Sequence, residues 1–253
     1  ALNVQVVGIT GSSGKTTTKD LVAGTLRGSF RVHATPRNLN NRIGLPQTIL
    51  NAPDDVQVLV LEMGTNEPGE IRALTEIAEP ALGVITTVSE THLEKLGSLE
   101  GVLEEKLDLF RGLGARGAGI VGDEPPVLRE RARSLVPGVT VVGWTEAAAP
   151  EFRPADPEIT QKGCYRFRWK GQQVRMGLPG RHSVQNALLA LAVADQLGVP
   201  ARDSARRVGK VQPRQMRSEV RSVGSLTLLL DCYNANPQSV RAALDLLETI
   251  QLL

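Results

Sequence analysis

The chain has 253 residues, of which 41% are hydrophobic and 22% charged, and its formal net charge is +2. This composition is typical of a globular protein, and the nearly balanced charge argues against nucleic acid or a membrane surface as the main partner. Its two cysteines, Cys164 and Cys232, lie far apart and form no CxxC pair, which excludes a disulfide framework or a zinc knuckle. We find neither a membrane-spanning run nor a signal peptide, and therefore expect a cytoplasmic protein without membrane insertion.

The first two-thirds of the chain alternates short apolar runs with helical patterns. Strands are expected at residues 4–9, 56–61, 83–88, 118–121 and 140–142, and helices at 15–26, 70–78 and 99–113. Strands that alternate with helices at this spacing predict an α/β fold, with a mostly parallel sheet and helices on both of its faces.

The pattern changes after residue 150. Residues 151–178 are polar and show period-two alternation, which predicts a small antiparallel insertion. Helical patterning returns at 183–197, and residues 209–217 have the composition of a linker. A strand at 226–230 and a helix at 238–250 follow. One strand and one helix cannot bury a core, so we expect a first domain at 1–212 and the incomplete beginning of a second at 213–253.

A glycine-rich loop follows the first expected strand. Residues 10–17 read Thr-Gly-Ser-Ser-Gly-Lys-Thr-Thr and lead into a helix. Glycines let backbone N–H groups face an anion, and the helix N-terminus adds a favourable dipole. Lys15 would reach the terminal phosphates, and the Thr16 hydroxyl would bind Mg²⁺. Ile9 stands where the usual phosphate loop has its first glycine, and the alternative is an ordinary helix-capping turn. Gly-Lys-Thr directly after an apolar strand favours the phosphate loop.

Two residues that follow apolar strands are candidates for metal binding. Glu62 comes at the end of the 56–61 strand, and ligands of open parallel sheets bind beyond the carboxyl ends of the strands. Its alternative role is that of a helix-capping or solvated acid. His92 follows the 83–88 strand, although a lone histidine is more often a hydrogen-bonded structural residue.

Lys106 stands out within the helix expected at 99–113. The apolar face of this helix consists of Leu99, Val102, Leu103, Phe110 and Leu113, and Lys106 falls in the middle of it. Burial would lower its pKa and leave a neutral amine, which can react with CO₂ to form a carbamate, an anionic metal ligand. The alternative is a side chain that reaches along apolar surface to water. Periodicity alone favours this alternative.

Motifs along nearly the whole chain match one family. They are 10–16 (TGSSGKT), 38–46 (NLNNRIGLP), 62–64 (EMG), 92–94 (HLE), Lys106, 180–182 (GRH) with Asn186, 216–219 (MRSE), and Asp231 with 233–237 (YNANP). In these residues the chain resembles the Mur ligases, the ATP-dependent amide ligases of peptidoglycan synthesis. Among them, the second, third and last motifs point to the member that joins D-Ala-D-Ala to UDP-MurNAc-tripeptide. The family's loop spacing also accounts for Ile9.

The resemblance implies roles for particular residues. Gly11, Ser12, Ser13, Gly14, Lys15, Thr16 and Thr17 would hold the ATP phosphates, with Asn186 near the base, Arg217 at the γ-phosphate, and Asp231, Tyr233 and Asn234 reaching the nucleotide from the last domain. Thr16 and Glu62 would bind one Mg²⁺, and His92 with a carbamylated Lys106 a second. Asn38, Asn40 and Asn41 would line the UDP-linked peptide. The catalytic set is Lys15, Glu62, His92, Lys106 and Arg217. For Lys106, the resemblance reverses the preference drawn from periodicity.

The resemblance also sets expectations for extent and activity. Mur ligases have three domains, and we expect this chain to hold the central P-loop ATPase-like domain and the start of a Rossmann-like C-terminal domain, without the N-terminal uridine-binding domain. The expected protein is a monomeric ligase of cell wall synthesis, hence of cell shape and division. Two alternatives remain open: another ligase of the superfamily, such as a neighbouring Mur enzyme or a folylpolyglutamate synthetase, and a nucleotide-binding fragment without ligase activity.

Overall fold

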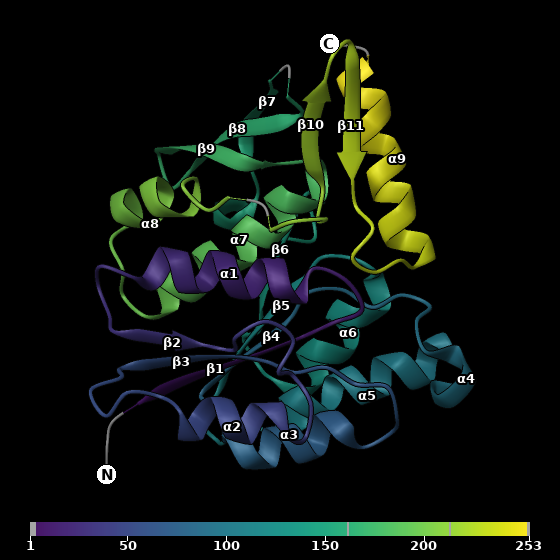
Figure 1. Ribbon diagram of the computed structural model, residues 1–253. Helices are drawn as coiled ribbons and strands as arrows, with labels where there is room; N and C mark the ends of the chain where they lie inside the picture. The colour runs from purple at the N-terminus through teal and green to yellow at the C-terminus, as the bar shows by residue number, and fades with distance from the viewer. Residues whose placement is uncertain (1–3, 161, 213, 252–253) are drawn as a thin grey trace.

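The computed structural model describes residues 4–160, 162–212 and 214–251 (Figure 1). A six-stranded parallel sheet with strand order β2-β3-β1-β4-β5-β6 forms its centre. Its strands are β1 (Gln5–Thr10), β2 (Val32–Ala34), β3 (Val58–Glu62), β4 (Leu82–Ile85), β5 (Ala118–Gly122) and β6 (Thr140–Val142). The predicted α/β fold with a parallel sheet is confirmed.

Helices cover both faces of the sheet. The described residues form the helices α1 (Lys15–Leu26), α2 (Gly44–Leu50), α3 (Glu70–Ala78), α4 (Leu93–Leu96), α5 (Leu99–Arg111), α6 (Pro126–Leu135), α7 (Arg181–Gln196) and α8 (Ala201–Val208), with a 3-10 turn at Pro150–Phe152, and α9 (Pro237–Gln251) in the C-terminal unit. In Figure 1, α1, α7 and α8 lie on one side of the sheet, and α2, α3 and α5 lie on the other. Each side has its own hydrophobic cluster. The sheet is thus buried on both faces, which explains why its strands are continuous apolar runs.

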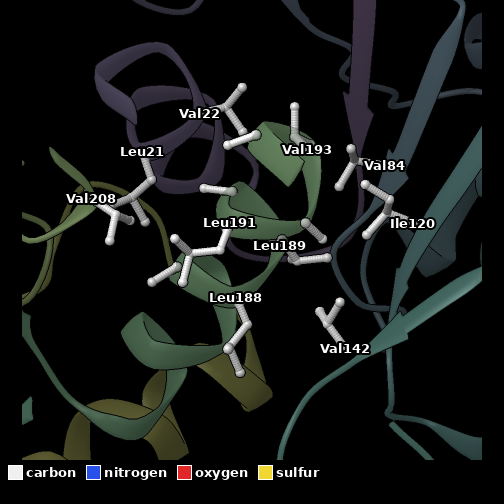
Figure 2. Packing of buried hydrophobic residues seen from close by; sticks show 14 of the residues in the cluster. Leu21, Val22, Val84, Ile120, Val142, Leu188, Leu189, Leu191, Val193 and Val208 are labelled. Atoms are coloured by element: carbon white, nitrogen blue, oxygen red, sulfur yellow. The ribbon is translucent and has the colours of Figure 1, made fainter. Parts of the chain in front are cut away.

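Helix α7 is the most deeply buried helix on the α1 side. Leu188, Leu189 and Leu191 are fully buried, and Figure 2 shows α7 packed between α1 and the sheet strands. Because this helix is apolar almost all round, its position is fixed by contacts on several sides. That position places its N-terminal residues beside the phosphate loop, where a Cβ added to Gly14 would lie 2.5 Å from Oδ1 of Asn186.

The predicted antiparallel insertion is a three-stranded sheet. Its strands are β7 (Ala155–Ile159), β8 (Cys164–Trp169) and β9 (Gln172–Pro179). Phe167 and Trp169 point into the core, whereas Arg166 and Arg168 are exposed, which accounts for the period-two alternation.

The C-terminal unit contains one strand more than the sequence pattern predicted. Strand β10 (Glu219–Val223) pairs antiparallel with β11 (Leu226–Leu230), and α9 follows. The polar β10 carries no apolar run of its own, and the register imposed by β11 makes it a strand. Helix α9 packs against the turn between β7 and β8, where a Cβ on Gly163 would approach Cδ1 of Leu246 to 2.6 Å.

Other short elements were also missed by the sequence pattern. Strand β2 and helices α2, α4, α6 and α8 were not predicted, because most have few buried positions and therefore a weak apolar period. Leu99 was expected on the buried face of α5 but is 37% exposed, since it occupies the first turn of the helix. None of the helices in the described part of the chain is long and apolar enough to cross a lipid bilayer.

Candidate nucleotide and metal site

A cleft of about 1570 Å³ opens at the carboxyl ends of the central strands. Its walls are the loop after β1, the segments after β3 and β4, the start of α7 and residues of the C-terminal unit. In an open parallel sheet this edge is the usual ligand site, because the loops there converge from several strands.

The glycine loop between β1 and α1 is tightly held. Gly14 has a φ of 81°, and the close approach of Asn186 leaves no room for a Cβ there. The hydroxyl of Thr86 donates to the Ser13 carbonyl at 2.5 Å, and Lys15 Nζ donates to the Gly11 carbonyl at 2.7 Å. Burial lowers the pKa of Lys15, Glu62 opposes this shift, and Arg217 adds to it. The loop thus places a lysine and a helix N-terminus at one wall of the cleft.

Glu62 lies at the end of β3 and is 2% exposed. Its Oε1 accepts hydrogen bonds from the Thr16 hydroxyl at 3.1 Å and from Asn40 Nδ2 at 2.8 Å. Its Oε2 is buried and has no hydrogen-bond partner among the described residues. A buried carboxylate oxygen without a donor is a suitable ligand for a hard cation, so Glu62 and Thr16 fit a Mg²⁺ ion.

Lys106 is buried on α5, with only 1% of its surface exposed. The periodicity-based expectation that it reaches water is therefore wrong, since α5 packs this position against the sheet. Burial lowers the pKa of Lys106 well below its ordinary value; the charge of Lys15 adds to this, and Glu105 and Glu70 oppose it. Desolvation favours the neutral amine. The neutral amine is the form that would react with CO₂ to give a carbamate.

His92 lies in the left-handed region, with φ of 55°, immediately before α4. Burial lowers its pKa, and the positive charges of Lys106 and Lys15 lower it further. His92, Lys106 and Lys15 therefore lie close enough to influence one another's titration. Across residues 4–160, 162–212 and 214–251, no cluster of three or more His, Cys, Asp or Glu side chains could hold a metal by itself. Any Mg²⁺ here would depend on other oxygens, as is common at sites where substrate phosphates complete the coordination.

The C-terminal unit reaches the phosphate loop. Arg217 Nη2 donates to the Thr16 hydroxyl at 3.3 Å, and its guanidinium lies 4.2 Å from the centre of the Tyr233 ring. Asn236 Nδ2 donates to Ser13 Oγ at 2.9 Å. Arg217 and Asn236 thus meet the loop from about two hundred positions further along the chain.

Several predicted site residues line the cleft and form hydrogen bonds within the protein. The carboxamide of Asn41 accepts from the backbone N–H of Gly44 at 2.8 Å and so caps α2. Asn234 bonds the N–H of its neighbour Ala235, and Asp231 accepts from the N–H of Ser218 at 2.8 Å. Asn186 accepts from the hydroxyl of Thr18 at 3.2 Å. Asn38, Asn40, Asn41, Asn186, Asp231 and Asn234 all contribute to the cleft wall.

The sequence reading did not assign four residues that the structure places at or beside the cleft. Thr86 and Asn236 hold the phosphate loop, as described above. His182 lies 3.1 Å from the Ser218 hydroxyl, joining α7 to the C-terminal unit. Glu105 accepts from the backbone N–H groups of Gly69 and Ile71 at 2.7 and 2.8 Å. Asn236 and His182 stand within recognised motifs, whereas no local pattern marks Thr86 or Glu105.

Residues 9–194 match the family described as the Mur ligase middle domain. The chain belongs to the Mur ligase family. The match covers the parallel sheet from the end of β1 and most of α7, and with them the phosphate loop, Glu62, His92 and Lys106. The family assignment drawn from the motifs is thus confirmed.

Two curated relatives of this chain carry the same name. The UDP-N-acetylmuramoyl-tripeptide–D-alanyl-D-alanine ligase of Bacillus subtilis (strain 168) is 37% identical over 254 residues, covering 99% of this chain and 54% of that protein. The ligase of the same name from Treponema pallidum (strain Nichols) is 38% identical over 242 residues, covering 95% of this chain and 51% of its own length. This chain therefore spans about half the length of the curated relatives it matches.

Solved Mur ligase structures have the same fold. MurF from Acinetobacter baumannii superposes with a TM-score of 0.89 at 29% identity, covering 97% of this chain and 54% of its own. MurF ligase from Thermotoga maritima in complex with ADP gives 0.87 at 27% identity, covering 98% of this chain and 57% of its own. The C-terminal unit is thus included in the similarity.

Proposed function

We propose that this chain forms the ATP-binding centre of a ligase that joins D-Ala-D-Ala to a UDP-MurNAc-tripeptide in peptidoglycan precursor synthesis. The observation that supports this most strongly is the convergence of Lys15, Glu62 and Arg217 from three separate elements on Thr16 and its phosphate loop. Relatives that carry this ligase name match nearly the whole chain, and a similar structure is an ADP complex.

The proposed reaction has two steps. The tripeptide carboxylate attacks the γ-phosphorus of ATP, giving an acyl phosphate and ADP. The amine of D-Ala-D-Ala then attacks the acyl carbon, and phosphate leaves through a tetrahedral intermediate. Because negative charge accumulates in both steps, the main requirement is fixed positive charge. Lys15 from the loop and Arg217 from the C-terminal unit supply it beside Thr16.

The proposal includes two metal sites. We assign one Mg²⁺ to Thr16 and Glu62, supported by the unpartnered Oε2, and a second to His92 and a carbamylated Lys106, supported by the lowered pKa of that lysine. When bound, these ions would neutralise charge on phosphate oxygens. The protein's own part is to hold the carboxylate and the hydroxyl together in a dry pocket.

The remaining assignments concern ATP and the peptide substrate. Gly11 to Thr17 would bind the ATP phosphates through backbone N–H groups. We place the base region near Asn186 and the rest of the nucleoside near Asp231, Tyr233 and Asn234. The UDP-linked peptide would reach Asn38, Asn40 and Asn41, which line the cleft beside Glu62.

The two-domain division also belongs to the proposal. We assign 1–212 to a central domain and 213–253 to the start of a C-terminal domain; the boundary at 213 and both chain ends lie outside the described residues. Closure of the two parts over ATP would exclude water and bring Arg217 onto the phosphates. We further propose that the protein is a cytoplasmic monomer.

A turnover assay tests the ligase function. The protein as its gene encodes it is incubated with ATP, Mg²⁺, UDP-MurNAc-tripeptide and D-Ala-D-Ala, and phosphate release is measured with each acceptor omitted in turn. We expect release only when both acceptors are present. Release with a free amino acid in place of D-Ala-D-Ala would favour a neighbouring Mur ligase, and release with a folate and glutamate would favour a folylpolyglutamate synthetase. ATP binding without any turnover would favour a nucleotide-binding fragment.

A further inference from the structure

Asp20 of α1 and Arg214, which leads into the C-terminal unit, form a two-point ion pair. The guanidinium Nη2 lies 2.6 Å from Oδ1 of Asp20, and Nε contacts Oδ2. The pair joins residues 194 positions apart in sequence. A guanidinium that contacts both oxygens of a carboxylate fixes the direction of the two side chains as well as their distance.

The Asp20 carboxylate is itself held in place. Lys19 is fully buried, and its Nζ lies 3.1 Å from Oδ1 of Asp20 and donates to the Thr35 carbonyl at 2.9 Å. The hydroxyl of Thr35 accepts from the backbone N–H of Glu62 at 2.9 Å. Asp20 is therefore a pre-oriented acceptor, connected through buried groups to the strand end that carries Glu62.

Two arginines of the same turn contact the same helix. The backbone N–H of Arg217 donates to the carbonyl of Arg214 at 3.2 Å. Arg214 contacts Asp20, and Arg217 contacts Thr16. Residues 16 and 20 are four apart in α1 and therefore lie about 6 Å apart on one face. The linker thus runs along this face with one arginine on each turn of the helix.

We propose that Asp20 and Arg214 are positioning residues, whose ion pair fixes the linker on α1 so that Arg217 reaches Thr16 and the nucleotide phosphates. This inference rests on the proposed function for the part played by Arg217. Neither Asp20 nor Arg214 needs to touch the nucleotide. Their effect on the reaction passes through the four-residue turn, 214–217, that they anchor.

The test uses Arg214→Gln, Arg214→Lys, Asp20→Asn and the double variant Asp20→Asn/Arg214→Gln in the protein as its gene encodes it. Arg206→Gln is the matched control, because it removes an Arg–Asp contact of 3.0 Å on the exposed face of α8. We measure hydrogen exchange of backbone amides 214–219 with ADP and Mg²⁺ bound, together with kcat and KM for ATP. Melting temperature identifies variants that fold poorly.

We expect Arg214→Gln to speed exchange in this segment and to lower kcat about tenfold, since displacing a transition-state contact by about 1 Å has effects of this order or larger. KM for ATP should change by less than about threefold, because the phosphate loop is intact. Arg214→Lys should recover part of kcat through its remaining charge. The double variant should lose no more than the worse single variant, because both remove the same contact. Arg206→Gln should match the wild type.

Different results would contradict the positioning role of the ion pair and the proposed ligase function. If Arg214→Gln leaves exchange of 214–219 unchanged, the positioning role is wrong whatever the turnover. Equal loss in Arg214→Gln and Arg206→Gln, or additive losses in the double variant, would also overturn it. If the wild type has no ligase turnover but exchange rises only in the Asp20 and Arg214 variants, the ligase function is wrong and the anchoring of the linker stands.

Discussion

The hydroxyl of Thr16 lies 3.1 Å from Oε1 of Glu62, where the start of α1 meets the end of β3. These residues are 46 positions apart in sequence, and the pairing of β1 with β3 brings them together. Asn40 Nδ2 donates to the same carboxylate oxygen, whereas Oε2 of Glu62 has no hydrogen-bond partner among the described residues. The free oxygen, the hydroxyl and the adjacent Lys15 define the part of the cleft where phosphates and a cation would meet.

Glu62→Gln should weaken nucleotide binding only when Mg²⁺ is present. The substitution keeps the shape of the side chain but removes the anionic oxygen that would bind the ion. We expect the affinity for ATP with Mg²⁺ to fall about tenfold or more, corresponding to about 1.4 kcal/mol or more, while affinity in EDTA changes little. Calorimetric titration under both conditions measures this. Equal losses with and without Mg²⁺ would remove Glu62 from the metal site.

Glu105→Gln provides a contrast, because Glu105 is also a buried carboxylate but serves the fold. Its oxygens accept from Gly69 and Ile71 N–H groups and from the Thr65 hydroxyl. Losing these charge-assisted bonds should lower the free energy of unfolding by about 2 kcal/mol. Urea unfolding measures it. The Mg²⁺-dependent part of ATP affinity should be retained, and its loss would instead place Glu105 in the site.

Lys106→Ala should abolish ligase turnover in a way that small acids partly reverse. The lowered pKa of Lys106 favours the neutral amine, to which CO₂ would add at Nζ with loss of a proton to give an anionic carbamate. Truncation should lower kcat by about two orders of magnitude or more, and acetate or propionate should restore part of it by supplying a carboxylate. Wild-type turnover in the variant would rule out the carbamate, and rescue of Glu105→Gln by the same acids would make the effect non-specific.

The pH dependence of stability should reflect His182. Burial lowers the pKa of His182, and the Asp231 carboxylate partly opposes this. The folded state therefore binds this proton less readily than the unfolded chain, which takes it up below about pH 6.5. The stabilisation is present above that pH and is lost as pH falls towards the lowered folded pKa.

Substitution of His182 tests this. In His182→Gln, urea unfolding at about pH 7.5 and about pH 5.5 should show a smaller loss of stability on acidification, by at most about 1.4 kcal/mol for each pH unit. His33→Gln is the comparison, because it also removes a buried ring nitrogen: the Nε2 of His33 has no hydrogen-bond partner among the described residues. An unchanged pH slope in His182→Gln would show that this imidazole titrates normally.

The apolar pattern predicted the sheet because its strands are buried on both faces. Leu59, Val60 and Leu61 form such a run, and α1 and α3 were predicted at their observed bounds. The pattern failed for β10 and α8, where few side chains are buried and neighbouring elements decide the conformation. It also misjudged Lys106, because periodicity places a side chain on a face but does not say whether that face leaves a path to water.

The sequence by itself determined the phosphate loop, the parallel α/β core and the family, because each depends on residues that are adjacent or regularly spaced. Only the tertiary structure decided that Asn41 caps a helix, that Glu105 holds the start of α3, and that Arg214 binds Asp20. These contacts depend on which donor and acceptor meet once the core has formed. Burial raises the free-energy cost of any polar group left without a hydrogen-bond partner, and this cost favours the arrangement in which donors and acceptors are paired.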